Sequence, residues 1–136
     1  MNNELAWFLA TSSNPRWRDP ARAVRLAKKA VAVQQDSANC RNTLGVAHYC
    51  NGDYKDAVTE LKRAMDLRSA GDSFDWFFLA MAHWRLGESD LARTWFDRAV
   101  QWMDKYNPQD DELRRIRAEA EALLSKAGIR KNDDPH

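Results

Sequence analysis

Apolar residues recur every three or four positions along most of the chain, and this spacing predicts α-helices. Glycine and proline punctuate the pattern. Gly52 and Gly87 each follow an apolar segment, where glycine ends a helix without strain, and Pro20 can open a helix. Pro108 precedes the last apolar segment, and Gly128 predicts its end. The pattern predicts seven helices, over residues 3–11, 20–34, 38–50, 54–68, 74–86, 89–105 and 109–126.

Small residues return at nearly constant intervals, which indicates an internal repeat. Successive members of each column are 34 or 35 residues apart, and the one-residue slip falls in the turn-rich segment 69–73. Alanine or glycine where two helices cross lets their backbones approach closely, so the repeat predicts helix pairs. The columns are Ala23, Ala57 and Ala92; Ala30, Ala64 and Ala99; Gly45 and Ala80; Gly52 and Gly87.

Polar residues stand where these helices need N-terminal caps. Asp19 precedes Pro20, and Asp53 follows Gly52 directly. Ser89, rather than Glu88, is the predicted cap of the sixth helix, because a serine hydroxyl accepts a hydrogen bond from the first turn.

These residues resemble the tetratricopeptide repeat, a helix–turn–helix unit of 34 residues. The first unit, residues 4–37, matches at Trp7, Ala23 and Ala30, but the segment 11–15 cuts its first helix short. The second unit, residues 38–71, matches at Leu44, Gly45, Ala47, Gly52, Asp53, Tyr54, Ala57, Leu61 and Ala64. The third unit, residues 73–106, matches at Trp76, Leu79, Ala80, Ala82, Gly87, Ala92, Phe96 and Ala99.

The resemblance implies an all-α fold, an α-solenoid of three such units followed by a C-terminal capping helix over about 109–126. We expect a single domain over residues 1–128 and a flexible tail over residues 129–136. The chain is also similar to repeat segments of large bacterial multidomain proteins, including Ser/Thr protein kinases. It would then be one module of a signalling protein.

The resemblance further implies a protein-interaction or scaffold module that binds a peptide or a partner protein. The first helices of successive units would form a concave face, and Leu5 and Phe8 could extend it. The family's ligand-facing positions correspond to Asn39, Asn42, Val46, Tyr49, Phe74, Phe77, Met81 and Trp84. The last four form one aromatic and methionine stripe, which either lines a groove or packs in a core or dimer interface.

Two further partners stay open. The stripe could drive self-association, which would make the chain an oligomerisation element. Six cations between Arg16 and Lys29 could instead contact nucleic-acid phosphates, although a solvated helix face explains them more simply. Recognition of a C-terminal carboxylate is not expected, because Phe74 and Phe78 stand where the family's clamp carries cations.

Composition narrows the functional class. The net charge is +1, from 21 basic and 20 acidic side chains, which disfavours a generally basic nucleic-acid binder. No apolar run reaches membrane-spanning length, and the acidic start does not resemble a secretory signal. Cys40 and Cys50 on one helix would lie too far apart for a disulfide. We therefore expect a cytoplasmic protein.

We expect neither catalysis nor a cofactor. The five glycines are scattered singly, so no phosphate-binding loop is present, and no motif pairs a nucleophile with a base. His48 and His83 occupy equivalent positions in two units, and we expect them to pack within helix pairs rather than bind metal. Asp110, Asp111 and Glu112 are expected to favour a helix N-terminus.

Overall fold

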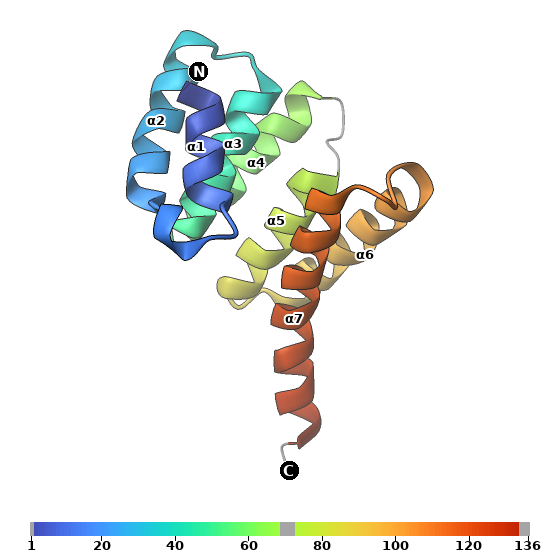
Figure 1. Cartoon of the computed structure of the whole chain (residues 1–136). Coiled ribbons are helices and arrows are strands. Elements are labelled where there is room, and N and C mark those ends of the chain that lie inside the picture. Colours follow the sequence, from blue (N-terminus) through green and yellow to red (C-terminus); the bar gives the residue numbers. More distant parts are fainter. Residues whose placement is uncertain (1, 69–72, 134–136) are drawn as a thin grey trace. The chain divides into compact units, whose positions relative to one another are not determined.

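The computed structural model describes the backbone of residues 2–68 and 73–133, and the side chains as far as Ser125. This part of the chain is all-α, as the sequence predicts, and its helices pack in sequential pairs (Figure 1). The predicted turn at 69–72 lies outside the described residues. The elements are α1 (Asn2–Thr11), η1 (Pro15–Trp17), α2 (Pro20–Val33), α3 (Ala38–Cys50), α4 (Tyr54–Leu67), α5 (Ser73–Arg85), α6 (Ser89–Tyr106) and α7 (Asp111–Asp133).

The chain divides into two compact units, Met1–Gly71 and Asp72–His136. The division falls in the loop to which the sequence assigns the one-residue slip between repeats. The first unit therefore holds two helix pairs, and the second holds one pair and α7. The single domain over residues 1–128 stays a prediction.

In the first unit, α1 packs on α2 and α3 packs on α4, while α3 also packs on α1 and α2. Small side chains lie at these crossings, as the repeat predicts. Ala23, Ala57 and Ala64 are completely buried, although Ala30 is only half-buried. Gly45 faces Leu61 so closely that an added Cβ would lie 2.7 Å from the leucine Cγ. Small residues therefore set how closely α3 approaches α4.

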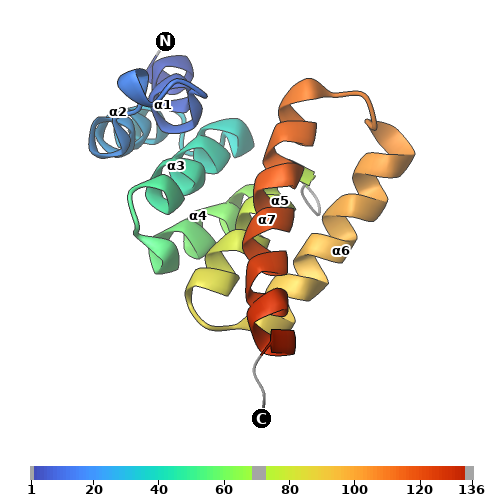
Figure 2. The same ribbon diagram turned by 60° about the horizontal axis from the view of Figure 1, so that its bottom comes forward.

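The second unit repeats this packing between α5 and α6, and α7 packs mainly on α5 (Figure 2). Ala92 and Ala99 are completely buried on α6, like their counterparts in α4. The Ser73 hydroxyl donates a buried hydrogen bond of 2.8 Å to the main-chain oxygen of Ala99, which joins the start of α5 to α6. Leu113 and Ile116 bury the apolar side of α7.

We expect Ala57→Leu and Ala92→Leu each to lower the free energy of unfolding by about 1–3 kcal/mol, because a longer side chain overpacks a closed crossing. Chemical denaturation monitored by circular dichroism measures the change. Ala32→Leu on the exposed side of α2 is the matched control and should change stability by about 0.5 kcal/mol or less. Wild-type stability in both crossing variants would contradict the assigned crossings.

Helix ends follow the sequence except at the caps of α4 and α6 and at the two ends of α7. Asp53 takes the predicted cap position of α4, but its side chain makes no cap hydrogen bond. Gly52 and Gly87 adopt φ of 85° and 82°, the left-handed conformation expected of glycine after a helix. Ser89 is the first residue of α6 rather than its cap, and Glu88 takes the cap position without a side-chain cap bond. The last helix begins at Asp111, not near residue 109. It also continues past Gly128 to Asp133, since an interior glycine weakens a helix by only about 1 kcal/mol.

Candidate functional site

The first four predicted contact residues lie on α3, where their exposure differs. Asn39 is exposed at the start of the helix and Tyr49 is half-buried near its end. Between them, Asn42 is 4% exposed and Val46 is completely buried. The Tyr49 ring also packs against Tyr54 of α4, with centroids 5.5 Å apart. Of the four predicted contact residues on this helix, Asn39 and Tyr49 are therefore the two that a partner can reach directly.

The aromatic and methionine stripe on α5 has the same distribution. Phe74 and Trp84 are half-buried near the two ends of the helix, whereas Phe77 is completely buried and Met81 is 1% exposed. The Phe77 ring lies edge-on to Phe96 of α6, with centroids 5.8 Å apart. The centre of the stripe thus belongs to the core of the second unit, and a partner would reach it only if neighbouring side chains moved.

The turns that join α3 to α4 and α5 to α6 each hold a buried histidine. His48 Nδ1 lies 3.2 Å from Asp53 Oδ2, and His83 Nδ1 lies 2.8 Å from Glu88 Oε1. In each turn the acidic residue's main-chain N–H also donates to the histidine's carbonyl oxygen. Hydrogen bonds from Asn51 and His48 lower the pKa of Asp53. These carboxylates therefore hold a turn together and do not cap α4 and α6.

One group of possible metal ligands lies at the turn between α3 and α4. His48, Asp53 and Asp56 each place a ligand atom within 4.8 Å of the others, among the residues whose side chains are described. The second unit keeps the equivalent His83 and Glu88 but has Leu91 in place of Asp56. His83 and Glu88 form their pair in the second unit without a third acid. The turn alone is therefore sufficient to explain the histidine–carboxylate pair.

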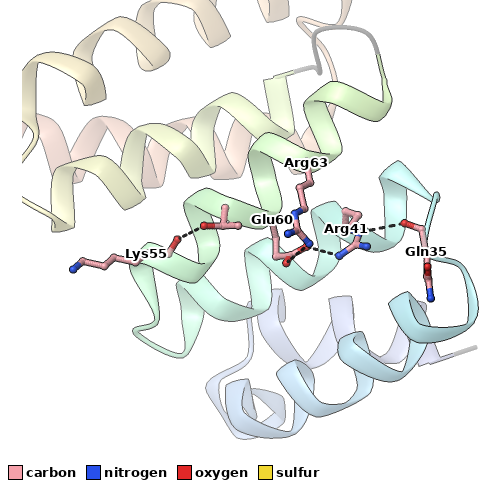
Figure 3. Close-up of polar contacts among 6 residues, drawn as sticks. Gln35, Arg41, Lys55, Glu60 and Arg63 are labelled. Atoms are coloured by element: carbon pink, nitrogen blue, oxygen red, sulfur yellow. Dashed lines mark hydrogen bonds and ion pairs between the residues drawn. The ribbon is translucent and has the colours of Figure 1, made fainter.

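The two helix pairs α3–α4 and α5–α6 differ most along one edge. In the pair α3–α4, Arg41 Nη1 lies 3.0 Å from Glu60 Oε1, and Arg41 Nε donates a hydrogen bond to the main-chain oxygen of Gln35 (Figure 3). Arg63 Nη1 lies 3.7 Å from Glu60 Oε2. Residues 35 positions later replace this ionic edge with Trp76, Trp95 and Arg98. The same place in the repeat therefore carries ions in one unit and aromatic rings in the other.

The aromatic edge, which we define as Trp76, Trp95, Arg98, Trp102 and Tyr106, is a connected cluster. Ring centroids are 6.4 Å apart for Trp76 and Trp102, and 5.1 Å apart for Trp102 and Tyr106. The Arg98 guanidinium lies 5.8 Å from the Trp76 ring centroid and 5.1 Å from that of Trp95. The contact residues predicted from the sequence do not include this cluster, because they lie only on the first helix of each unit. Helical spacing of the aromatic residues of α6 was the available signal.

The other surfaces are less distinctive. The cations of the Arg16–Lys29 patch are exposed, and Arg18 Nε donates to the main-chain oxygen of Ser12. A hollow of about 300 Å³ beside α7 contains Arg117. Burial alone would lower the pKa of Arg117, but hydrogen bonds to Asp104 and Glu121 outweigh burial and raise it. The positive charge of Arg117 is thus already balanced by the carboxylates of Asp104 and Glu121. The hollow is lined by Met103, Pro108, Arg114, Arg117, Ala118 and Glu121.

The fold and repeat spacing define a helical-repeat protein, and comparison with protein families specifies the repeat. Residues 37–70 and residues 76–98 each match a family model described as Tetratricopeptide repeat. The chain therefore carries tetratricopeptide repeats, as the sequence predicts. Neither match is to an enzyme family, and repeats of this family generally mediate protein–protein interaction. No curated protein matches the chain. Among the described residues, no helix is both long and apolar enough to span a membrane.

Proposed function

We propose that this chain is a non-catalytic module that binds a partner protein or peptide through the first helices of its repeats. The observation that carries the proposal is the accessible polar and aromatic chemistry at the ends of these helices. Asn39 on α3 can exchange hydrogen bonds with a peptide backbone, and Phe74 and Trp84 on α5 offer partly exposed aromatic surface. Buried Asn42, Val46, Phe77 and Met81 fix the helices that present these groups.

Half-exposed aromatic residues suit such a role physically. Binding hot spots are enriched in tryptophan, and their side chains become fully covered and lose their contact with water in the complex. Trp84 fits this description, because it is an aromatic residue that is only partly covered in the isolated chain. A peptide that covers it gains apolar burial without first ordering a mobile side chain.

The test introduces a photo-crosslinking amino acid at one position at a time in the intact chain. We expect crosslinks to partner proteins in an extract of the source cells from positions 39, 74 and 84. Exposed Thr59 on α4 and exposed Arg93 on α6 provide control positions on the second helices, from which we expect none. Mass spectrometry of the adducts identifies the partner.

A second measurement uses the double variant Phe74→Ala/Trp84→Ala. Its affinity for the crosslinked partner should fall at least about tenfold, because truncating a buried anchor costs about 2 kcal/mol or more. Unchanged affinity, or crosslinks that come equally from positions 59 and 93, would exclude the first-helix faces. Crosslinks only to copies of this chain would identify self-association instead.

A further inference from the structure

Four of the five residues of the aromatic edge lie on α6, the helix that the proposed function leaves unused. Leu91, Trp95, Arg98, Trp102 and Tyr106 are spaced by 4, 3, 4 and 4 residues, which places them on one face of α6. The buried crossing of α6 on α5 uses the neighbouring stripe of Ala92, Phe96 and Ala99, while on this face Arg98 and Trp102 contact the edge residue Trp76 of α5. The helix therefore carries a second apolar stripe that the fold covers only in part.

This stripe is substantially exposed. Tyr106 is 58% exposed and Leu91 is 46% exposed, and Trp95 and Trp102 are half-buried. The equivalent edge of the first unit shows that aromatic residues are not required to join the two helices. There the Arg41–Glu60 ion pair occupies the places of Trp76 and Trp95. An apolar surface that packing does not require is typical of an interaction site.

The charge on this stripe has one sign. Arg98 and Lys105 lie against its rings, with the Lys105 ammonium 5.2 Å from the Tyr106 centroid. Thr94 and Gln101 border the stripe next to Lys105, and the acids of α6 at 90, 97 and 104 follow beyond them around the helix. The stripe therefore presents aromatic rings and two cations to a partner, and none of its five residues is acidic.

This charge pattern discriminates between possible occupants. Two copies of the chain meeting through this face would bring cations together without an answering carboxylate, which is unfavourable. A long polyanion such as nucleic acid would also meet the acidic remainder of the unit, since residues 72–136 hold 13 acidic and 10 basic side chains. A short acidic segment with apolar side chains can match the stripe locally and avoid both costs.

We infer that the α6 stripe, from Leu91 to Tyr106, is a second docking surface that binds an acidic, apolar-containing segment of a partner protein. Carboxylates of the segment pair with Arg98 and Lys105, and its apolar side chains cover Trp102 and Tyr106. This surface is separate from the first-helix faces and does not depend on them.

The test uses a displayed library of random peptides of about twelve residues, selected on the intact chain after depletion on Arg98→Glu/Tyr106→Ala. The recovered peptides should be enriched in Asp and Glu together with apolar residues. A synthetic recovered peptide should lose affinity at least about tenfold on Arg98→Glu, and replacing its acids with lysine should restore binding to that variant. Arg63→Glu, at the equivalent position of α4, and Trp84→Ala should leave its affinity unchanged.

Several results would overturn the inference. Recovered peptides without acidic enrichment, no peptide surviving the depletion, or equal affinity on wild type and Arg98→Glu would each do so. Binding of a mixed-sequence DNA oligonucleotide that competes with the peptide and is lost in Arg98→Glu would assign the stripe to nucleic acid. A dimer mass in light scattering that Tyr106→Ala returns to monomer would assign it to a second copy.

Discussion

Phe77→Ala should lower the free energy of unfolding by about 3–5 kcal/mol, the cost of removing a large aromatic ring from a closed core. Phe77 is completely buried, and its ring packs edge-on against Phe96. The loss includes the apolar burial of the ring and the cavity left behind, because the surrounding helices relax only partly. Urea denaturation, followed by circular dichroism, measures the change in midpoint at constant slope.

Leu91→Ala is the matched control in the same unit. Because Leu91 is 46% exposed, its truncation should change stability by about 0.5 kcal/mol or less. Equal effects of the two substitutions would show that Phe77 is a surface residue. In that event the centre of the α5 stripe would be open to a partner, and the wider set of contacts predicted from the sequence would regain its support.

Gly45→Leu should destabilise the first unit by about 3 kcal/mol, the upper part of the range for overpacked cores. Even the Cβ of an alanine at position 45 would lie 2.7 Å from Leu61 Cγ, 3.0 Å from Leu61 Cδ2 and 3.2 Å from Leu61 N. Leu61 is completely buried, so its side chain has little room to move aside. The backbones of α3 and α4 must then separate.

For the smaller variant Gly45→Ala, the prediction concerns the sign of the change in the free energy of unfolding. In a helix with open space beside it, replacing glycine by alanine stabilises the protein by about 1 kcal/mol. We expect destabilisation here, and we expect it to disappear in the Leu61→Ala background because the obstructing side chain has gone. A double-mutant cycle of denaturation midpoints measures this coupling. A more stable Gly45→Ala single variant would contradict the close approach of α3 and α4.

The histidine turns show how a repeat conserves geometry while exchanging side chains. Asp53 in the first turn and Glu88 in the second differ in length, yet each carboxylate reaches a histidine Nδ1 five residues earlier. The left-handed glycine between them provides the common backbone path. The turn is therefore specified by the histidine, the glycine and the acid together, and it connects the two helices of a pair regardless of which partner the domain binds.

The ionic and aromatic edges show the opposite behaviour. Here the backbone positions are equivalent, but Arg41 and Glu60 have become Trp76 and Trp95. The Arg41 and Glu60 side chains are only 16% and 14% exposed. Replacing a largely buried ion pair by well-packed apolar residues is often neutral for stability, so either chemistry can occupy such an edge without endangering the fold. Positions of this kind are free to acquire specificity, which is why the edge of the second unit merits a binding experiment of its own.

The sequence by itself determined the elements and their pairing. Apolar spacing gave the helices to within a few residues, and the small-residue columns located Ala57, Ala64, Ala92 and Ala99 at buried crossings. These features are local or periodic, because a helix needs only its own spacing and a crossing needs only a small side chain. The continuation of α7 past Gly128 departs from the prediction, since glycine permits a helix end but does not require one.

Only the tertiary structure decided which of the predicted contact residues are accessible. Phe74, Phe77, Met81 and Trp84 share one helical face in the sequence, but packing against neighbouring helices buries Phe77 and Met81 and leaves Phe74 and Trp84 partly exposed. The aromatic edge likewise unites Trp76 with residues of α6 that follow it by 19 to 30 positions. Burial and such contacts depend on the three-dimensional approach of separate helices, which the spacing within one helix cannot specify.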